Sequence, residues 1–366
     1  MANAPQRATD SASARSRLPS GTRPARPTIR DVAETAGVSQ STTSRALRNQ
    51  GYVAAEVRER VRKAAAKLGY VPDAMARHLR QQVSRSLGVL VSDLRNPFYA
   101  DLAAGASRAA RRAGYTVMLI DDHLLAEEEA EASEVLASMR VAGVVITPLS
   151  ARVPHYLLRQ HIPVVEVDQQ FAADSCDAVV VDNRVAAAKL TEHLLDLGHR
   201  RIALLGDDTR WTTGRERVRG YEQALTRAGI GVDPTLEVTA GWDVEEARQT
   251  AVELLQGVNP PSAVLAANAV LAEGIWRAAT ELGLRIPADL SVVSCEEAPW
   301  MTLVSPQLTA VRQDGSALGE AAVIRLLERI GAPGTPVSTL VFRAKVTLRG
   351  SSGPAADAPR VVRPVA

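Results

Sequence analysis

The stretch TIRDVAETAGVSQSTTSRALR, residues 28–48, predicts two short helices that meet at a sharp angle. Thr28 can cap the first helix, because Asp31 stands at the third helical position and completes a capping box. Gly37 supplies a left-handed residue that ends this helix, and Ser39 can cap a second one. The buried side of the pair would comprise Ile29, Val32, Ala33, Ala36, Val38, Thr43, Ala46 and Leu47.

A third helix completes this unit. The second helix would cover residues 40–48, and an apolar stripe predicts the third over residues 55–68, with Gly69 as its stop. The stripe consists of Val57, Val61, Ala64, Ala65 and Leu68. Residues 28–72 are therefore expected to form a small helix-turn-helix unit.

Charge is distributed unevenly along the 366 residues. The net charge is only +2, yet residues 1–85 hold 16 Lys and Arg against 6 Asp and Glu, and the remainder holds 27 against 35. A basic end on an acidic body indicates that one end meets a polyanion. Residues 1–27 are rich in Pro, Ser and Arg and are expected to be a disordered basic arm.

The sequence offers no sign of export, membrane insertion or a metal site. Its first residues lack the apolar core of a signal peptide, and no later run is apolar enough to span a bilayer. Cys176 and Cys295 lie too far apart for a zinc motif and are expected to be free, buried thiols. A cytoplasmic protein without metal or cofactor is predicted.

From Leu87 onward, short apolar runs alternate with helical stretches. The runs are LGVLVS, YTVMLID, AGVVITP, IPVVEVD, DAVVVD, RIALLGD, SAVLAAN and DLSVVSC. This alternation predicts parallel βαβ units, and the length fits two Rossmann-like lobes. Ligands of such folds bind beyond the carboxyl ends of the strands, which selects Ser92, Asp121, Asp168, Asn268 and Glu296.

Seven motifs, in order along the chain, resemble those of the lac-repressor family of bacterial transcription regulators. They are TIRDVAETAGVS, KLGYVPDAMARHL, NPFY, VVVDNRVAAAKLTEHLLDLGHRRIALLG, RERVRGY, LGLRIPADLSVV and LTAVRQ. The resemblance implies a helix-turn-helix headpiece followed by a two-lobed domain like that of periplasmic binding proteins. It divides the chain into an arm (1–27), a headpiece (28–72), a hinge helix and linker (73–85), an effector-binding and dimerisation domain (86–353) and a disordered tail (354–366).

The resemblance also implies contacts with double-stranded operator DNA. Gln40, Ser41 and Arg45 occupy recognition positions, and Arg can bind guanine in bidentate fashion. Further positions implied are Thr28 and Thr42 on phosphates, and Ala76 and Leu79 of the hinge in the minor groove. Leu79 would act as a wedge beside its symmetry mate, so a homodimer is expected. A tetramer is not expected, because no long C-terminal segment with heptad repeats is seen. Thr43 and Asp73 stand at positions where the family usually has Val and Asn, respectively.

The effector site carried over from the family comprises Ser92, Phe98, Tyr99, Asp168, Arg217, Trp242, Asn268 and Glu296. Carboxylates, a guanidinium and a Trp face suit a polyol, so a carbohydrate or its derivative is the first expectation. The segment 294–297 reads Ser-Cys-Glu-Glu where relatives commonly have Gly-Phe-Asp-Asp, and Ala269 replaces a frequent Asp. These departures keep a nucleoside or another polar metabolite open as the effector.

Two other classes of protein fit the sequence less well. Glu296 and Glu297 form an acidic pair, but no phosphate-binding loop or Ser-His-Asp set accompanies them, so an enzyme is not expected. A solute-binding protein would share the lobes but not the headpiece. His193 and His199 have no metal-site spacing and are expected to cap or pack. The sequence thus predicts a ligand-controlled transcriptional regulator, most simply a repressor.

Overall fold

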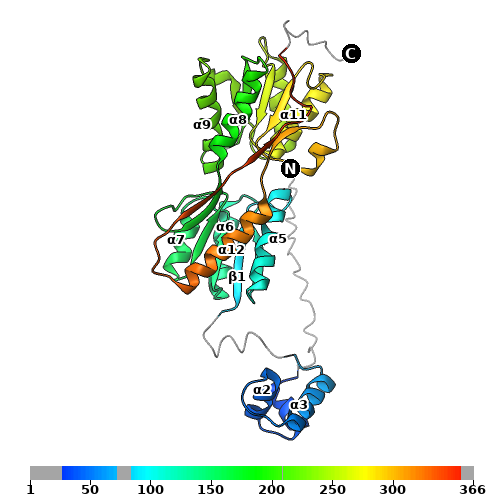
Figure 1. Ribbon diagram of the computed structural model, residues 1–366, viewed down its shortest axis with the longest axis vertical. Helices are drawn as coiled ribbons and strands as arrows, with labels where there is room; N and C mark the ends of the chain where they lie inside the picture. Colours follow the sequence, from blue (N-terminus) through cyan, green and yellow to red (C-terminus); the bar gives the residue numbers. More distant parts are fainter. Residues whose placement is uncertain (1–26, 72–83, 208, 356–366) are drawn as a thin grey trace, which may run out of the picture. The chain divides into compact units, whose positions relative to one another are not determined.

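The computed structural model describes residues 27–71, 84–207 and 209–355. The chain divides into two compact units, Met1–Gln81 and Gln82–Ala366 (Figure 1). The expected hinge positions Ala76 and Leu79 lie outside the described residues, as do most of the expected arm and tail.

The first unit contains the three predicted helices, α1 (Ile29–Ala36), α2 (Gln40–Arg48) and α3 (Ala55–Leu68). Local signals set their ends: Thr28 and Asp31 form a capping box, and Gly37 ends α1 at φ 64°. The Ser39 side chain accepts a hydrogen bond from the backbone N–H of Thr42 at 3.2 Å. The core consists of Val32, Ala36, Ala46, Val61, Ala64 and Ala65, which confirms most of the predicted packing. Ile29 and Val57 are only partly buried and lie outside this core.

The first lobe of the second unit has a six-stranded sheet in the order β11-β5-β4-β3-β1-β2, and all of its strand pairs are parallel. Its strands are β1 (Ser86–Val91), β2 (Thr116–Asp121), β3 (Gly143–Ile146), β4 (Val164–Val167), β5 (Asp177–Val181) and β11 (Thr339–Phe342). Its helices are α5 (Pro97–Arg112), α6 (Ala126–Ser138), α7 (Arg152–Arg159) and α12 (Gly315–Gly331). Helices α5 and α12 cover one face, and α6 and α7 the other.

The second lobe repeats this plan with the order β12-β10-β9-β8-β6-β7. Its strands are β6 (Ile202–Gly206), β7 (Glu237–Thr239), β8 (Ala263–Ala266), β9 (Ser291–Ser294), β10 (Thr309–Arg312) and β12 (Lys345–Thr347). Its helices are α8 (Asn183–Asp196), α9 (Thr212–Arg227), α10 (Val244–Gln256) and α11 (Ala269–Glu281), with short 3₁₀ turns η1 (Pro234–Leu236) and η2 (Pro299–Thr302). The two-lobed α/β fold is confirmed, although the β10–β12 pair is antiparallel where the sequence suggested only parallel pairing.

The polypeptide crosses between the lobes three times: after β5, between β10 and α12, and between β11 and β12. Helix α12 therefore returns to the first lobe, where it packs closely on α5. The approach is close because glycines line it: a Cβ added at Gly319 would lie 2.0 Å from the carbonyl oxygen of Leu102. A Cβ at Gly105 would lie equally close, at 2.0 Å, to the carbonyl oxygen of Ser316.

Both histidines singled out in the sequence hold the C-terminal segment against the second lobe. The Nε2 atom of His193 lies 2.8 Å from the Ser352 hydroxyl. The buried His199 contacts Ser262 and Ser291 through its two ring nitrogens, at 2.8 and 3.0 Å, and its Nε2 atom lies 3.1 Å from the carbonyl oxygen of Gly353. The expected packing role is thus seen. Over the described ranges, no helix has both the length and the apolar character needed to cross a membrane.

Candidate functional site

The polar face of α2 presents the three expected recognition side chains. Gln40, Ser41 and Arg45 are exposed, whereas Thr43 and Ala46 on the opposite side are buried. The Thr43 hydroxyl donates a hydrogen bond to the carbonyl oxygen of Ser39 at 3.0 Å. This bond satisfies the buried hydroxyl that replaces the usual Val, so the substitution leaves no unpaired polar group in the core.

The two threonines expected on phosphates are engaged within the headpiece. The Thr28 hydroxyl lies 2.9 Å from the Asp31 carboxylate, to which it donates, and the Thr42 hydroxyl lies 2.9 Å from that of Ser39. These contacts fix the starts of α1 and α2. Contact of either threonine with a phosphate remains a prediction.

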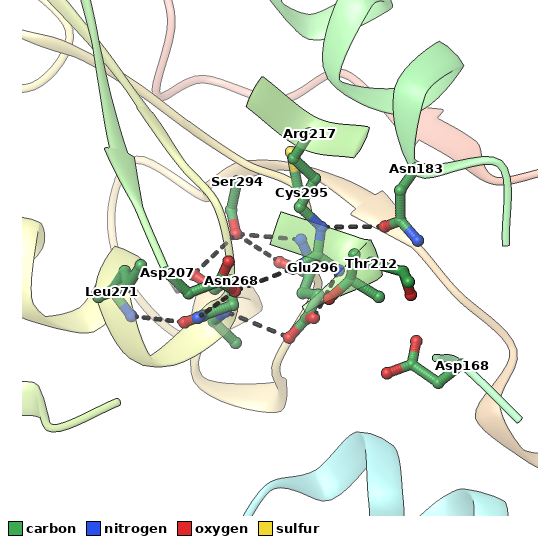
Figure 2. A network of polar contacts seen from close by, with 12 residues as sticks. Asp168, Asn183, Asp207, Thr212, Arg217, Asn268, Leu271, Ser294, Cys295 and Glu296 are labelled. Carbon is green, nitrogen blue, oxygen red and sulfur yellow. Dashed lines mark hydrogen bonds and ion pairs between the residues drawn. The ribbon is translucent and has the colours of Figure 1, made fainter. Parts of the chain in front are cut away.

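A second site lies where the lobes meet. We call it the inter-lobe cluster and define it as Tyr99, Asp168, Asp207, Arg217, Asn268 and Glu296, of which Figure 2 labels the last five. Four members follow the carboxyl ends of strands β4, β6, β8 and β9, as the fold requires for a ligand site. All six side chains are buried.

Arg217 on α9 organises the cluster. Its Nη2 atom donates to Glu296 at 2.8 Å, and its Nη1 atom lies 3.5 Å from the Asp207 carboxylate. Its Nε atom donates to Asn183 Oδ1 at 2.9 Å. The side chain is only 1% exposed. Burial opposes its charge, but the carboxylates of Glu296 and Asp207 outweigh this and raise the pKa of Arg217 above its ordinary value.

Asp168 faces this group from the first lobe. It adopts a left-handed backbone conformation, φ 67°, directly after β4, and its carboxyl group accepts a hydrogen bond from the Tyr99 hydroxyl at 3.3 Å. Figure 2 shows the carboxyl group pointing toward the second-lobe members of the cluster without a dashed contact to any of them. Burial raises the pKa of Asp168 to about 7, since attraction to Arg217 only partly offsets it and Glu296 adds repulsion.

Asp207 and Asn268 form the second-lobe wall. Asn268 Nδ2 donates to Asp207 Oδ2 at 3.2 Å, and Asn268 Oδ1 caps α11 by accepting from the N–H of Leu271 at 2.9 Å. Asp207 is 1% exposed, and its Oδ1 atom is buried without a hydrogen-bond partner among the described residues. Burial raises the pKa of Asp207, against the pull of Arg217. One carboxylate oxygen is therefore left for a ligand or water to satisfy.

Direct hydrogen bonds join the lobes beside the cluster. Gln169, next to Asp168, donates from Nε2 to the Thr213 hydroxyl at 2.8 Å and accepts from the Thr212 hydroxyl at 2.7 Å. Thr212 and Thr213 begin α9, the helix that carries Arg217. A ligand that changes the contacts of Asp168 and Arg217 would therefore also act on the angle between the lobes.

The other expected site residues have different partners. Ser92 lies 2.7 Å from the hydroxyl of Thr147 within the first lobe. Phe98 packs edge-on against Tyr99 and so reaches the cluster indirectly, with ring centroids 5.2 Å apart. Trp242 stacks edge-on with Trp211, also at 5.2 Å, and its Nε1 atom is buried without a partner in the described structure. Contact of these three with a ligand remains a prediction.

The paired acids Glu296 and Glu297 diverge, since Glu296 joins the cluster while Glu297 lies 2.9 Å from Arg349. Asp121 accepts the backbone N–H of Leu94 at 2.9 Å and is not a member of the cluster.

Two further residues of this polar network, Asp207 and Asn183, are not among the site residues predicted from the sequence. Asp207 ends the run RIALLGD, so its position after a strand was a usable signal. Asn183 begins α8 and is 4% exposed, yet it holds Arg217. Its role depends on the pairing of α8 with α9, which no local pattern reveals.

The two units and this site define a class of protein: a helix-turn-helix DNA-binding unit joined in one chain to a two-lobed ligand-binding unit. Comparison with known proteins identifies the family. Residues 28–73 match the model of bacterial regulatory proteins of the lacI family, and residues 84–344 match that of periplasmic binding proteins and the sugar-binding domain of the LacI family. The chain belongs to the LacI family of bacterial transcriptional regulators.

Its relatives include the ribose operon repressor of Haemophilus influenzae, 30% identical over 88% of this chain and 98% of the relative. The HTH-type transcriptional repressor CytR of Escherichia coli is 29% identical over 89% of this chain and 96% of its own length. Among solved structures, the lac repressor dimer bound to operator and the anti-inducer ONPF has a TM-score of 0.79. That structure shares 30% sequence identity and covers 89% of this chain and 99% of its own.

Proposed function

We propose that this protein is a cytoplasmic repressor that binds a pseudo-palindromic operator as a homodimer and is controlled by a sugar or sugar derivative. Gln40, Ser41 and Arg45 would read bases, and the cluster around Arg217 would bind the effector. Relatives support this proposal. Those compared include repressors of a ribose operon, a lac repressor dimer on its operator and a CelR–cellobiose complex, the last 27% identical with a TM-score of 0.68.

The observation that carries the proposal is the buried polar cluster between the lobes. A guanidinium and several carboxyl groups can each bind adjacent hydroxyl groups, as a sugar requires. Asp168 belongs to one lobe and Arg217 to the other, so a ligand that bridges them favours one lobe arrangement over another. A coupling of about 1–3 kcal/mol would change operator affinity roughly 5- to 150-fold.

Separable variants test the proposal. Arg45→Ala should weaken binding to DNA sites selected by the wild-type protein from a random pool roughly 10- to 100-fold, since a bidentate base contact contributes about 1–3 kcal/mol. Its effector affinity should be unchanged. Arg60→Ala, which removes an exposed charge from α3, is the matched control and should lose less.

The effector site needs a gentler change than Arg217→Ala, because that variant would leave buried carboxyl groups without their cation. Asp168→Asn keeps the shape, and Asn accepts the left-handed conformation. It should change sugar affinity in a thermal-shift assay and leave DNA binding without effector intact. Unchanged affinity for every ligand would refute this site, and binding of nucleosides alone would refute the sugar assignment.

A further inference from the structure

We propose that the effector carries a protonated amine as well as hydroxyl groups, as an amino sugar does, and that Asp168 and Asp207 bind the amine. This inference rests on the proposed function and narrows its ligand class. It starts from an imbalance of charge in the inter-lobe cluster.

The cluster holds three carboxyl groups and one guanidinium. Glu296 makes the shortest ion pair with Arg217, at 2.8 Å, whereas Asp207 lies 3.5 Å from it. For the Asp168 side chain the described structure gives a single hydrogen bond, from Tyr99 at 3.3 Å. Glu296 and Asp207 thus share one guanidinium, and Asp168 has no ion pair among the described residues, so a single cation of the cluster faces three carboxyl groups.

Burial makes this imbalance costly. Asp168 and Asp207 are 6% and 1% exposed, so water cannot screen them well. Burial raises the pKa of both groups, and the attraction to Arg217 only partly offsets this effect. The Oδ1 atom of Asp207 is, in addition, a buried acceptor that no donor of the described residues satisfies. A ligand that carries a cation would pair with these carboxyl groups and would give the Oδ1 atom of Asp207 a hydrogen-bond donor.

The geometry favours an organic cation over a metal ion. Within the described ranges, no set of three His, Cys, Asp or Glu side chains converges closely enough to hold a metal. An ammonium group needs only hydrogen-bond acceptors in three directions, and oxygens of separate carboxyl groups can supply them. Arg217 and Asn268 remain to bind hydroxyl groups of the same ligand.

Matched ligand pairs test the inference. The full-length protein would be titrated by calorimetry at pH 7 with D-glucosamine, D-galactosamine, D-mannosamine and glucamine. Each is compared with its hydroxyl parent, and the hexosamines also with their N-acetyl forms, which lack the charge. We expect one amine to bind about tenfold or more tightly than its uncharged counterparts, because a charge-assisted contact replaces a neutral one.

Isosteric variants assign the effect to its residues. Asp168→Asn and Asp207→Asn should each reduce the preference for the amine about tenfold without weakening a hydroxyl parent equally. Glu131→Gln, an exposed charge on α6, is the control and should leave the preference unchanged.

Two outcomes would overturn the inference in distinguishable ways. If a hydroxyl parent binds as tightly as its amine, the effector does not need a positive charge and this inference is wrong. The proposed function, a repressor controlled by a sugar, would be unaffected. If no member of the panel binds, the inference and the proposed sugar effector are both contradicted.

Discussion

Replacing Asp168 by Asn should stabilise the protein, and more strongly as the pH rises. The folded-state pKa of about 7 lies above the ordinary value of 3.8, because burial disfavours the charged form. Below pH 3.8 the group is neutral in both the folded and the unfolded protein and carries no ionisation cost. As the pH rises toward 7, the unfolded chain releases the proton first, so the wild-type protein loses stability over that range.

The magnitude follows from the pKa difference. Each pKa unit corresponds to about 1.4 kcal/mol. The wild type should therefore be destabilised by about 4 kcal/mol at pH 8 and by about 2 kcal/mol at pH 5, relative to a neutral side chain at this position. The substituted asparagine would not ionise, and its side-chain oxygen can still accept the hydrogen bond from Tyr99.

Urea unfolding at pH 5 and pH 8, followed by tryptophan fluorescence, measures the effect. All four tryptophans lie between residues 211 and 300, so the signal reports on the effector-binding unit. Asp93→Asn is a control of opposite sign: burial alone would raise the pKa of Asp93, but hydrogen bonds from Arg95 hold it below its ordinary value. That variant should lose stability above pH 4. If Asp168→Asn raises the free energy of unfolding equally at pH 5 and pH 8, ionisation of Asp168 is not the cause of the destabilisation.

Three further predictions concern the headpiece, the lobe core and DNA binding. Thr28→Ala removes the capping box of α1 and should destabilise the headpiece by about 1 kcal/mol in amide hydrogen exchange, whereas Thr35→Ala, with no cap to remove, should not. Gly319→Ala should lower the urea midpoint by the equivalent of about 2 kcal/mol or more, because its Cβ would meet a backbone oxygen of α5; Gly331→Ala, with open space around it, is the control. Operator affinity should fall steeply with salt in a fluorescence anisotropy titration, and a flat response would contradict phosphate contact by the headpiece.

The sequence predicted the headpiece closely because its signals are local. Thr28, Asp31, Gly37 and Ser39 each act within a few residues, and each performs the expected capping or turning role. The eight apolar runs likewise all contain strands, since buried parallel strands are continuously apolar. Fold class and family could therefore be predicted before any three-dimensional information.

What the sequence did not reveal depends on contacts between distant segments. Strand β11 reads Thr-Leu-Val-Phe and is mostly exposed at a sheet edge, and its three apolar residues are too short a run to distinguish a strand from a loop. The ion pair of Asp207 depends on α9, which places Arg217 beside the end of β6, and the sequence does not show that these two segments meet. Ser92 also follows a strand, but its hydroxyl is paired with Thr147, and its contact with a ligand stays a prediction. Position after a strand selects candidates, and the side-chain partners add information that the sequence does not carry.

The threefold crossing between the lobes has a consequence for synthesis of the protein on the ribosome. The first lobe needs Leu318, Ala322 and Val323 of α12 for its core, although most of its strands are made before residue 182. The second lobe needs β12, which follows α12 and β11. Neither lobe can therefore be finished until nearly the whole chain has emerged, whereas the headpiece is complete after about one fifth of it. A premature stop codon near the end of the coding sequence would yield a folded headpiece attached to two incompletely folded lobes. Such a truncation should therefore abolish effector control and dimerisation together.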